Sequence, residues 1–217
     1  MAAQDTRNRV VTEAIRLFNA QGSAAVSTNH IAEAAGISPG NLYYHYRNKE
    51  EIIRAIFDRV DAHWAASFVL PDDRVPALGD VRVVVRQTFA GIWTYRFFYR
   101  ELGALTRRDP ELAARFRTLR ERGIAGTESL LRAFHGAGVI DGPVDDDDLR
   151  RLARLMMLVA EFWLPFEETG SAVPGYEPID EGVALLMQIL DPYLADRALA
   201  GMAGARSAIP AREGGER

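Results

Sequence analysis

Aromatic and polar side chains are concentrated in one short stretch of the sequence. Asn41, Tyr43, Tyr44, His45 and Tyr46 fill five of six consecutive positions. Tyrosine hydroxyls and the histidine ring can hydrogen-bond to phosphate oxygens, and tyrosine rings can press on sugars and thymine methyl groups. A helix that faces only water would not carry so many aromatic side chains. The pattern therefore indicates a helix inserted into a groove of nucleic acid.

The residues before this stretch predict two short helices joined by a tight turn. Ser27 and Thr28 are N-cap candidates for the first helix, and Gly36 can adopt the left-handed conformation that the turn requires. Ser38 caps the second helix, and Pro39 takes its first position. The residues expected to pack inward are Ile31, Ala35, Ile37 and Leu42. At least two of the tyrosine rings cannot point inward together with Leu42. We therefore favour a groove-reading helix-turn-helix over the alternative, a small aromatic core.

Apolar residues recur with helical spacing through most of the remaining chain. A first helix ends at Gly22, and Asn48 caps a fourth. Long helical patterns follow at roughly 78–106, 110–136, 145–168 and 179–199. The sequence therefore predicts an all-α protein with a three-helix helix-turn-helix domain in residues 1–50. A helical domain is expected in 51–200 and a disordered tail in 201–217.

Composition limits the other classes of function. The 217 residues include no cysteine, which removes disulfides, thiolate nucleophiles and most structural zinc sites. The net charge is −4, but residues 1–60 carry seven Lys/Arg against six Asp/Glu. A reader with locally placed cations on an acidic body is compatible with this distribution. No signal peptide or transmembrane segment is evident, so a cytoplasmic protein is expected.

Motifs of enzymes and metal sites are not found in the sequence. It contains no HExxH, P-loop, GxGxxG or nucleophile-elbow pattern, so we do not expect an enzyme or a cofactor. The four histidines, at positions 30, 45, 63 and 135, are scattered and form no evident metal set. The run Asp145–Asp148 is better explained by favourable charges at a helix N-terminus than by a metal site.

The helix-turn-helix residues also resemble those of a known family. The pattern is Thr28…Ile31-Ala32…Ala35-Gly36-Ile37-Ser38…Leu42-Tyr43-Tyr44-His45-Tyr46…Asn48-Lys49-Glu50. It is similar to the N-terminal signature of the TetR family of bacterial regulators, over about residues 9–57. The resemblance implies an all-helical homodimer that binds a near-palindromic double-stranded operator and acts as a repressor. A small-molecule effector in the C-terminal domain would separate the two reading heads. The alternative is a DNA-binding regulator that a protein partner controls, or that has no small-molecule effector.

The resemblance also assigns roles to individual residues. Tyr43 and His45 match positions that contact phosphate, Thr28 matches a cap that touches phosphate, and Lys49 matches the cation of the fourth helix. The residues at base-facing or groove-facing positions are Pro39, Gly40, Asn41 and Tyr44. Arg7 is expected either to reach phosphate or the minor groove, or to lie on a solvated arm. Because Gly40 and Asn41 offer few long side chains, the operator sequence does not follow from these residues.

The C-terminal part is expected to hold the effector pocket and the dimer interface. A pocket needs bulky apolar walls with a few polar groups. The candidates are Phe89, Trp93, Arg96, Phe97, Phe134, Met156, Glu161, Phe162 and Trp163. A filled core is the alternative, because aromatic and methionine stripes at helical spacing are common in cores. Apolar stripes in 152–166 and 183–194 suit a dimer bundle of two helices from each subunit. A large apolar or aromatic effector is the favoured class.

The charge of Lys49 gives a first prediction. Its ammonium and the free N–H groups at the start of the next helix both favour a phosphate. Lys49→Ala should therefore weaken binding to all DNA sequences similarly and lower the slope of log K against log salt by about 0.9. Titrations at several salt concentrations measure this slope. An unchanged slope would exclude the phosphate contact.

Overall fold

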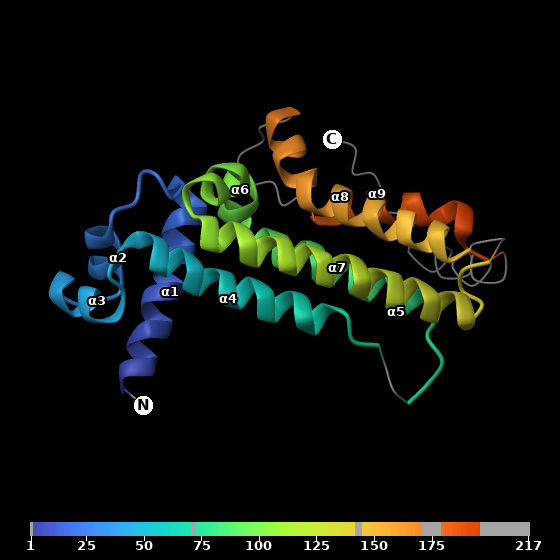
Figure 1. The fold of residues 1–217 in the computed structure, drawn as a ribbon, viewed down its shortest axis with the longest axis horizontal. Coiled ribbons are helices and arrows are strands. Elements are labelled where there is room, and N and C mark those ends of the chain that lie inside the picture. The colour runs from blue at the N-terminus through green and yellow to red at the C-terminus, as the bar shows by residue number, and fades with distance from the viewer. Residues whose placement is uncertain (1, 71–72, 142–144, 171–178, 196–217) are drawn as a thin grey trace, which may run out of the picture.

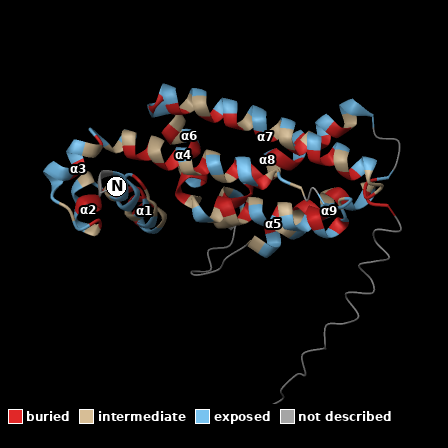
Figure 2. Ribbon diagram, turned by 90° about the horizontal axis from the view of Figure 1, so that it is seen from below, coloured by how far each residue is buried: buried red, intermediate tan, exposed pale blue. Residues whose placement is uncertain are grey.

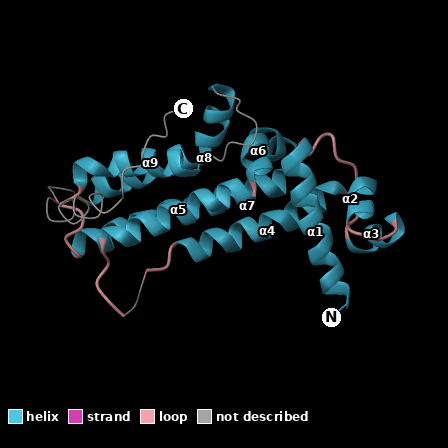
Figure 3. Cartoon of the chain, turned by 180° about the vertical axis from the view of Figure 1, so that it is seen from behind, coloured by secondary structure: helices cyan, strands magenta, loops and turns pink. Residues whose placement is uncertain are grey.

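The structure, a computed structural model, describes residues 2–70, 73–141, 145–170 and 179–195, and these form an elongated bundle of helices (Figures 1 and 3). The predicted helix-turn-helix domain, called the reading head below after its predicted role, contains α1 (Ala2–Gln21), α2 (Thr28–Ala34) and α3 (Pro39–His45). The body contains α4 (Lys49–Ser67), α5 (Leu78–Thr94), α6 (Arg96–Arg108), α7 (Pro110–Gly136), α8 (Asp146–Gly170) and α9 (Ile179–Leu190). A short 3-10 helix, η1 (Asp191–Tyr193), follows α9. The predicted all-α fold is confirmed.

Two hydrophobic cores lie one after the other along the molecule. The first joins the reading head to α4, α6 and the first half of α7, and its centre is a group of rings that includes Phe18, Phe57, Phe97 and Phe98. The second lies among α5, α7, α8 and α9, where Phe89 packs edge-on against Trp163 at 4.8 Å between ring centroids. Buried residues form stripes where the helices face one another (Figure 2). No helix within the described ranges is long and apolar enough to span a membrane.

The predicted helix over 78–106 is wrong in one respect, because two helices meet at Tyr95. The break is stabilised by Asn19, which lies on α1. Its side-chain Nδ2 donates to the carbonyl of Thr94 at 2.9 Å, and its Oδ1 accepts from the N–H of Phe97 at 3.1 Å. Asn19 thereby satisfies backbone groups that the interruption would leave without a partner. Local helical periodicity carries no sign of a partner 75 residues away.

The other predicted bounds agree more closely with the structure. Helix α7 has the predicted limits, and α8 begins one residue after Asp145. The last pattern, predicted over 179–199, is helical to Leu190 and then tightens into η1 at a proline, Pro192. The predicted tail in 201–217 lies outside the described residues.

The role of Asn19 can be tested by denaturation. Asn19→Ala removes both hydrogen bonds at the α5–α6 break, so we expect it to lower the free energy of unfolding by about 1–2 kcal/mol. Gln21→Ala, an exposed position at the end of the same helix, should change it by less than about 0.5 kcal/mol. Urea unfolding followed by circular dichroism compares the two. Equal effects would show that the break does not depend on Asn19.

Candidate nucleic-acid interface and interior cavity

The first helix of the motif begins with a capping box at Ser27. The Ser27 hydroxyl accepts from the N–H of His30 at 3.2 Å, and the His30 Nδ1 accepts from the N–H of Ser27 at 3.3 Å. Thr28 is the first residue inside the helix, so Ser27 and not Thr28 is the cap. After α2, Gly36 has φ +63°, the left-handed conformation predicted for the turn. Local signals therefore fix the first half of the motif.

The second helix presents most of its aromatic residues to solvent. Ser38 caps it by accepting from the N–H of Asn41 at 3.2 Å, Pro39 is its first residue and Leu42 is fully buried. Tyr44 is 82% exposed and Tyr43 is 49% exposed. The exposed face of α3 lies at the tip of the head (Figure 2).

Tyr46 differs from the outward-facing position that the sequence suggested. It ends α3 as the C-cap residue and is only 3% exposed. The Arg7 guanidinium lies 4.9 Å from the centre of its ring, in a cation–π contact. Tyr46 therefore belongs to the core of the head, and Arg7 lies against it from α1.

Apart from Lys49, the other residues predicted to contact DNA lie on α2 and α3, and the His45 ring is 5.1 Å from that of Tyr44. The hydroxyl groups of Thr28 and Tyr43 are 3.1 Å apart, which joins the start of α2 to the middle of α3. Pro39, Gly40 and Asn41 are all exposed in the first turn of α3. A side chain at Gly40 would meet no atom within 4 Å, so its backbone is open to a close approach from outside.

Lys49 has a structural contact that the sequence did not predict. Its Nζ donates to the carbonyls of Ser23 at 2.6 Å and Val26 at 3.0 Å, in the loop before α2. An ammonium has three donors, so one proton is left for another acceptor. Lys49→Ala therefore removes two bonds that hold this loop, and its effect on unfolding should be measured beside its salt slope.

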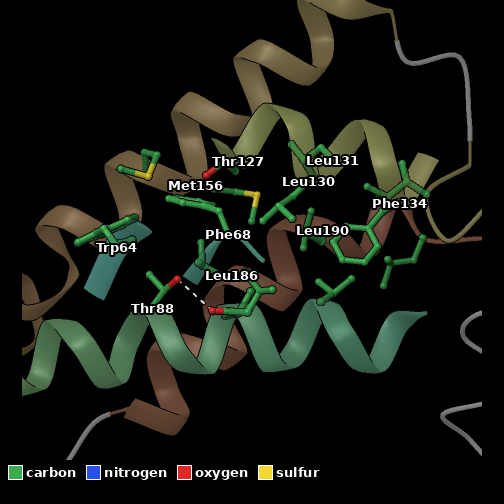
Figure 4. A pocket seen from close by; sticks show the side chains of 17 residues that line it. Trp64, Phe68, Thr88, Thr127, Leu130, Leu131, Phe134, Met156, Leu186 and Leu190 are labelled. Carbon is green, nitrogen blue, oxygen red and sulfur yellow. Dashed lines mark hydrogen bonds between the residues drawn. The ribbon is translucent and has the colours of Figure 1, made fainter. Parts of the chain in front are cut away.

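A cavity of about 50 Å³ lies in the body, between α4, α5, α7, α8 and α9 (Figure 4). Most of its lining is apolar, and the polar side chains are Thr88, Thr127 and the indole of Trp64. The Thr88 hydroxyl donates to the carbonyl of Val84 at 3.0 Å. Trp64 and Phe134 lie at opposite ends of the cavity in Figure 4. Among the residues that the structure describes, no ionisable side chain lines it.

The structure places two of the nine predicted pocket residues, Phe134 and Met156, on the cavity wall. Phe89 packs in the second core, Phe97 packs against Phe18 in the first, and Trp93 lies under the Arg96 guanidinium at 4.7 Å. The other three are Glu161, Phe162 and Trp163, on α8. These seven residues do not line the cavity.

Sequence reasoning missed the cavity residues of α4. The predicted pocket residues do not include Trp64 and Phe68, although both continue the apolar stripe of Ile56 and Val60 at the same spacing of four. Trp64 Nε1 donates to the Tyr99 hydroxyl at 2.8 Å. Burial raises the pKa of Tyr99, so this hydroxyl stays protonated. Continuing the stripe to the end of α4 would have found both residues.

Glu161 lies in a separate contact near this hydroxyl. It is 5% exposed and pairs through both carboxylate oxygens with the Arg120 guanidinium of α7. The pairing gives this buried carboxylate a structural partner.

An apolar groove runs along the outside of α8 and α9. It has a volume of about 440 Å³ and is lined by Leu158, Val159, Phe162, Trp163, Phe166, Leu185, Gln188 and Ile189. Phe166 is 74% exposed and Phe162 is 51% exposed. Two of the predicted pocket residues, Phe162 and Trp163, thus lie on this outer groove and not at the cavity.

Comparisons with known proteins identify the class to which this fold and head belong. Residues 10–56 match the family model described as bacterial regulatory proteins of the tetR family. Residues 59–202 match the model described as a bacterial transcriptional repressor, TetR. The chain therefore belongs to the TetR family of bacterial transcriptional regulators.

Individual relatives agree with this assignment. A TetR-family transcriptional regulator from Marinobacter aquaeolei VT8 has a solved structure that is 31% identical, with a TM-score of 0.82. That comparison covers 94% of this chain and 98% of the other. The HTH-type transcriptional regulator TtgR of Pseudomonas putida is 35% identical over 89 residues, which are 40% of this chain and 42% of TtgR. The regulator AcrR of Shigella flexneri is 29% identical over 93 residues, with the same coverage. The matches to these two curated relatives thus span less than half of their length.

Tyr44 of α3 and Tyr46, the C-cap residue of that helix, provide a matched pair for testing the described head. Tyr44→Ala should change the free energy of unfolding by less than about 0.5 kcal/mol, because the ring is exposed. Tyr46→Ala should lower it by about 3–5 kcal/mol, because it empties part of the core. Thermal and urea unfolding measure both. A large loss for Tyr44→Ala would show that its ring supports the fold.

Proposed function

We propose that this protein is a repressor that binds a near-palindromic operator as a homodimer and leaves it when a small, uncharged apolar molecule binds. The observation that carries the proposal is the exposed face of α3, where Tyr44 projects from a tightly capped helix. A ring that contributes little to the core but lies on a rigid helix is suited to groove contact. The protein acts as a binding protein and not as an enzyme, on operator DNA in the cytoplasm.

The contacts of the head support a division of roles. Thr28 and Tyr43 hold each other by a hydrogen bond, so their oxygens are positioned together for a phosphate. We infer two further phosphate anchors, His45, whose ring lies 5.1 Å from that of Tyr44, and the remaining donor of Lys49. The groove-facing set is Pro39, Gly40, Asn41 and Tyr44. Of these, Asn41 and Tyr44 have side chains that can hydrogen-bond to base edges.

The exposed face of α8 supports the dimer. Leu155, Leu158, Phe162 and Phe166 are between 45% and 74% exposed and follow one another at helical spacing. A continuous apolar face of this kind on a helix marks an interaction surface. A second copy related by a twofold axis would cover it with the same face, as isologous dimers do. Two heads on one dimer then require two half-sites.

The cavity supports the chemical class of the effector. Its walls carry no charge, and burying a charged ligand there would leave the charge without a partner. Among the described residues, no hydrogen bond of the Thr127 hydroxyl is found, so this group can orient one polar atom of a ligand. An apolar or aromatic molecule with a single hydrogen-bonding group fits these walls.

Selection of bound genomic fragments by the purified protein tests the proposal. We expect recovered fragments to share a near-palindrome with half-sites that place the recognition helices about 34–36 Å apart. Tyr44→Ala should weaken binding to them without a change in stability. Recovery of no common sequence, or tight binding of one half-site by a monomer, would contradict the proposal. Metabolites related to the neighbouring genes can then be screened for release.

The dimer face has its own test. Phe162→Glu places a charge in the apolar groove, so sedimentation at micromolar concentration should show monomers, and operator affinity should fall. Val83→Glu on α5 is the matched control, because Val83 is 53% exposed and Phe162 51%, and Val83 does not line the groove. If Val83→Glu dissociates the protein and Phe162→Glu does not, the interface lies elsewhere.

A further inference from the structure

The cavity is too small for the ligand that the proposed function requires. Its volume is about 50 Å³. An apolar cavity that holds benzene measures about 150 Å³, and one water occupies about 30 Å³ in the liquid. A molecule with even one aromatic ring can therefore enter only if a lining side chain leaves its place.

Phe68 is the lining ring whose backbone is held least. It follows the last residue of α4, Ser67, as the C-cap, and the chain continues into a loop. Phe134, the other phenylalanine of the lining, is 2% exposed and lies within α7. Phe68 is partly exposed and packs against both cores. Its ring can therefore move outward without breaking a helix.

The ring of Phe68 rests on a glycine of α7. A Cβ added at Gly126 would lie 2.9 Å from Phe68 Cγ and 3.1 Å from both Cδ atoms. One turn earlier, a Cβ at Gly123 would lie 2.8 Å from Met157 Cε and 3.8 Å from the Trp64 ring. The two glycines thus form a shallow seat on α7 for side chains of α4 and α8, and the Phe68 ring fits on it only because Gly126 has no side chain.

We propose that Phe68, seated on Gly126, is a plug that an uncharged apolar ligand displaces, and that its displacement is the step by which the ligand acts on the reading head. This inference rests on the proposed function. Phe68 ends α4, whose 19 residues extend for about 28 Å. The other end of α4 begins with Lys49, which holds the carbonyls of the loop before α2. A shift of the plug therefore moves the helix that positions the motif.

Gly126→Ala tests the plug without a ligand. The added methyl group pushes the Phe68 ring off its seat, so the variant should lose about tenfold or more in affinity for a fragment selected by the wild-type protein. Gly136→Ala is the control on the same helix, because a Cβ there meets no atom within 4 Å. Its affinity should equal that of the wild type. A folded Gly126→Ala protein that binds the fragment normally would overturn the proposal.

The double variant separates displacement of the ring from general damage to α7. In Phe68→Ala/Gly126→Ala the methyl group has no ring to displace, so DNA affinity should return to that of Phe68→Ala alone. The effects of the two substitutions on DNA affinity should thus be strongly non-additive. A double variant that binds DNA as weakly as Gly126→Ala, with Phe68→Ala normal, would also overturn the proposal.

Binding of 1-naphthol, followed by its fluorescence, gives a measurement that does not depend on DNA. The wild-type ring must leave before the probe enters, whereas Phe68→Ala has an open site, so the variant should bind about tenfold more tightly. Equal affinities would show that Phe68 does not block the cavity. If the wild type selects no DNA fragment, the proposed function fails, while this comparison still decides whether the plug exists.

Discussion

Helix α4 lies in the first hydrophobic core, and Phe68, the residue that caps its end, packs against both cores. The rest of the arrangement depends on the packing of this helix. Its residues Ile52, Ile56 and Phe57 are buried with the reading head, whereas Trp64 and Phe68 reach the cavity. Burial of these side chains removes a large apolar area from water along the helix. A rigid helix that begins in the head and ends at the cavity cannot shift at one end without a change at the other. The head and the cavity are therefore joined by packing and not by a flexible linker.

Helix α6 provides a second attachment between head and body. Phe97 packs against Phe18, with 5.0 Å between ring centroids, and Asn19 binds the backbone at the break before α6. The Glu101 carboxylate accepts from the N–H of Ser23 at 2.7 Å and from its hydroxyl. These contacts hold the end of α1 and the start of the loop to which Lys49 also donates. The loop before α2 is thus fixed from α6 on one side and from α4 on the other.

The head could be predicted from the sequence because its signals are local. Ser38, Asn48 and Gly36 act within three or four residues, and the structure shows each in the expected role. The α5–α6 break could not be predicted, because it depends on Asn19 from a distant helix. The prediction of the cavity walls failed for a related reason. Helical periodicity shows that Phe97 is buried, but not in which core it is buried. Tyr46 was predicted to face outward with the other aromatic residues, but it is buried. It follows the last residue of α3 as the C-cap, where helical spacing no longer fixes the direction of a side chain.

Helix α8 separates the cavity from the outer groove, and in the proposed dimer this sets how a ligand would affect the two heads. Met156, Met157 and Ala160 line the cavity, while Leu158, Phe162 and Phe166 line the groove on the other side. If a partner subunit covers the groove, α8 is held from outside and has little freedom to yield. Pressure from a ligand would then act on the other walls, among them Phe68, which follows the last residue of α4. Since the half-site spacing of DNA is fixed by its helical repeat, even a small shift of each head would reduce the fit of the pair.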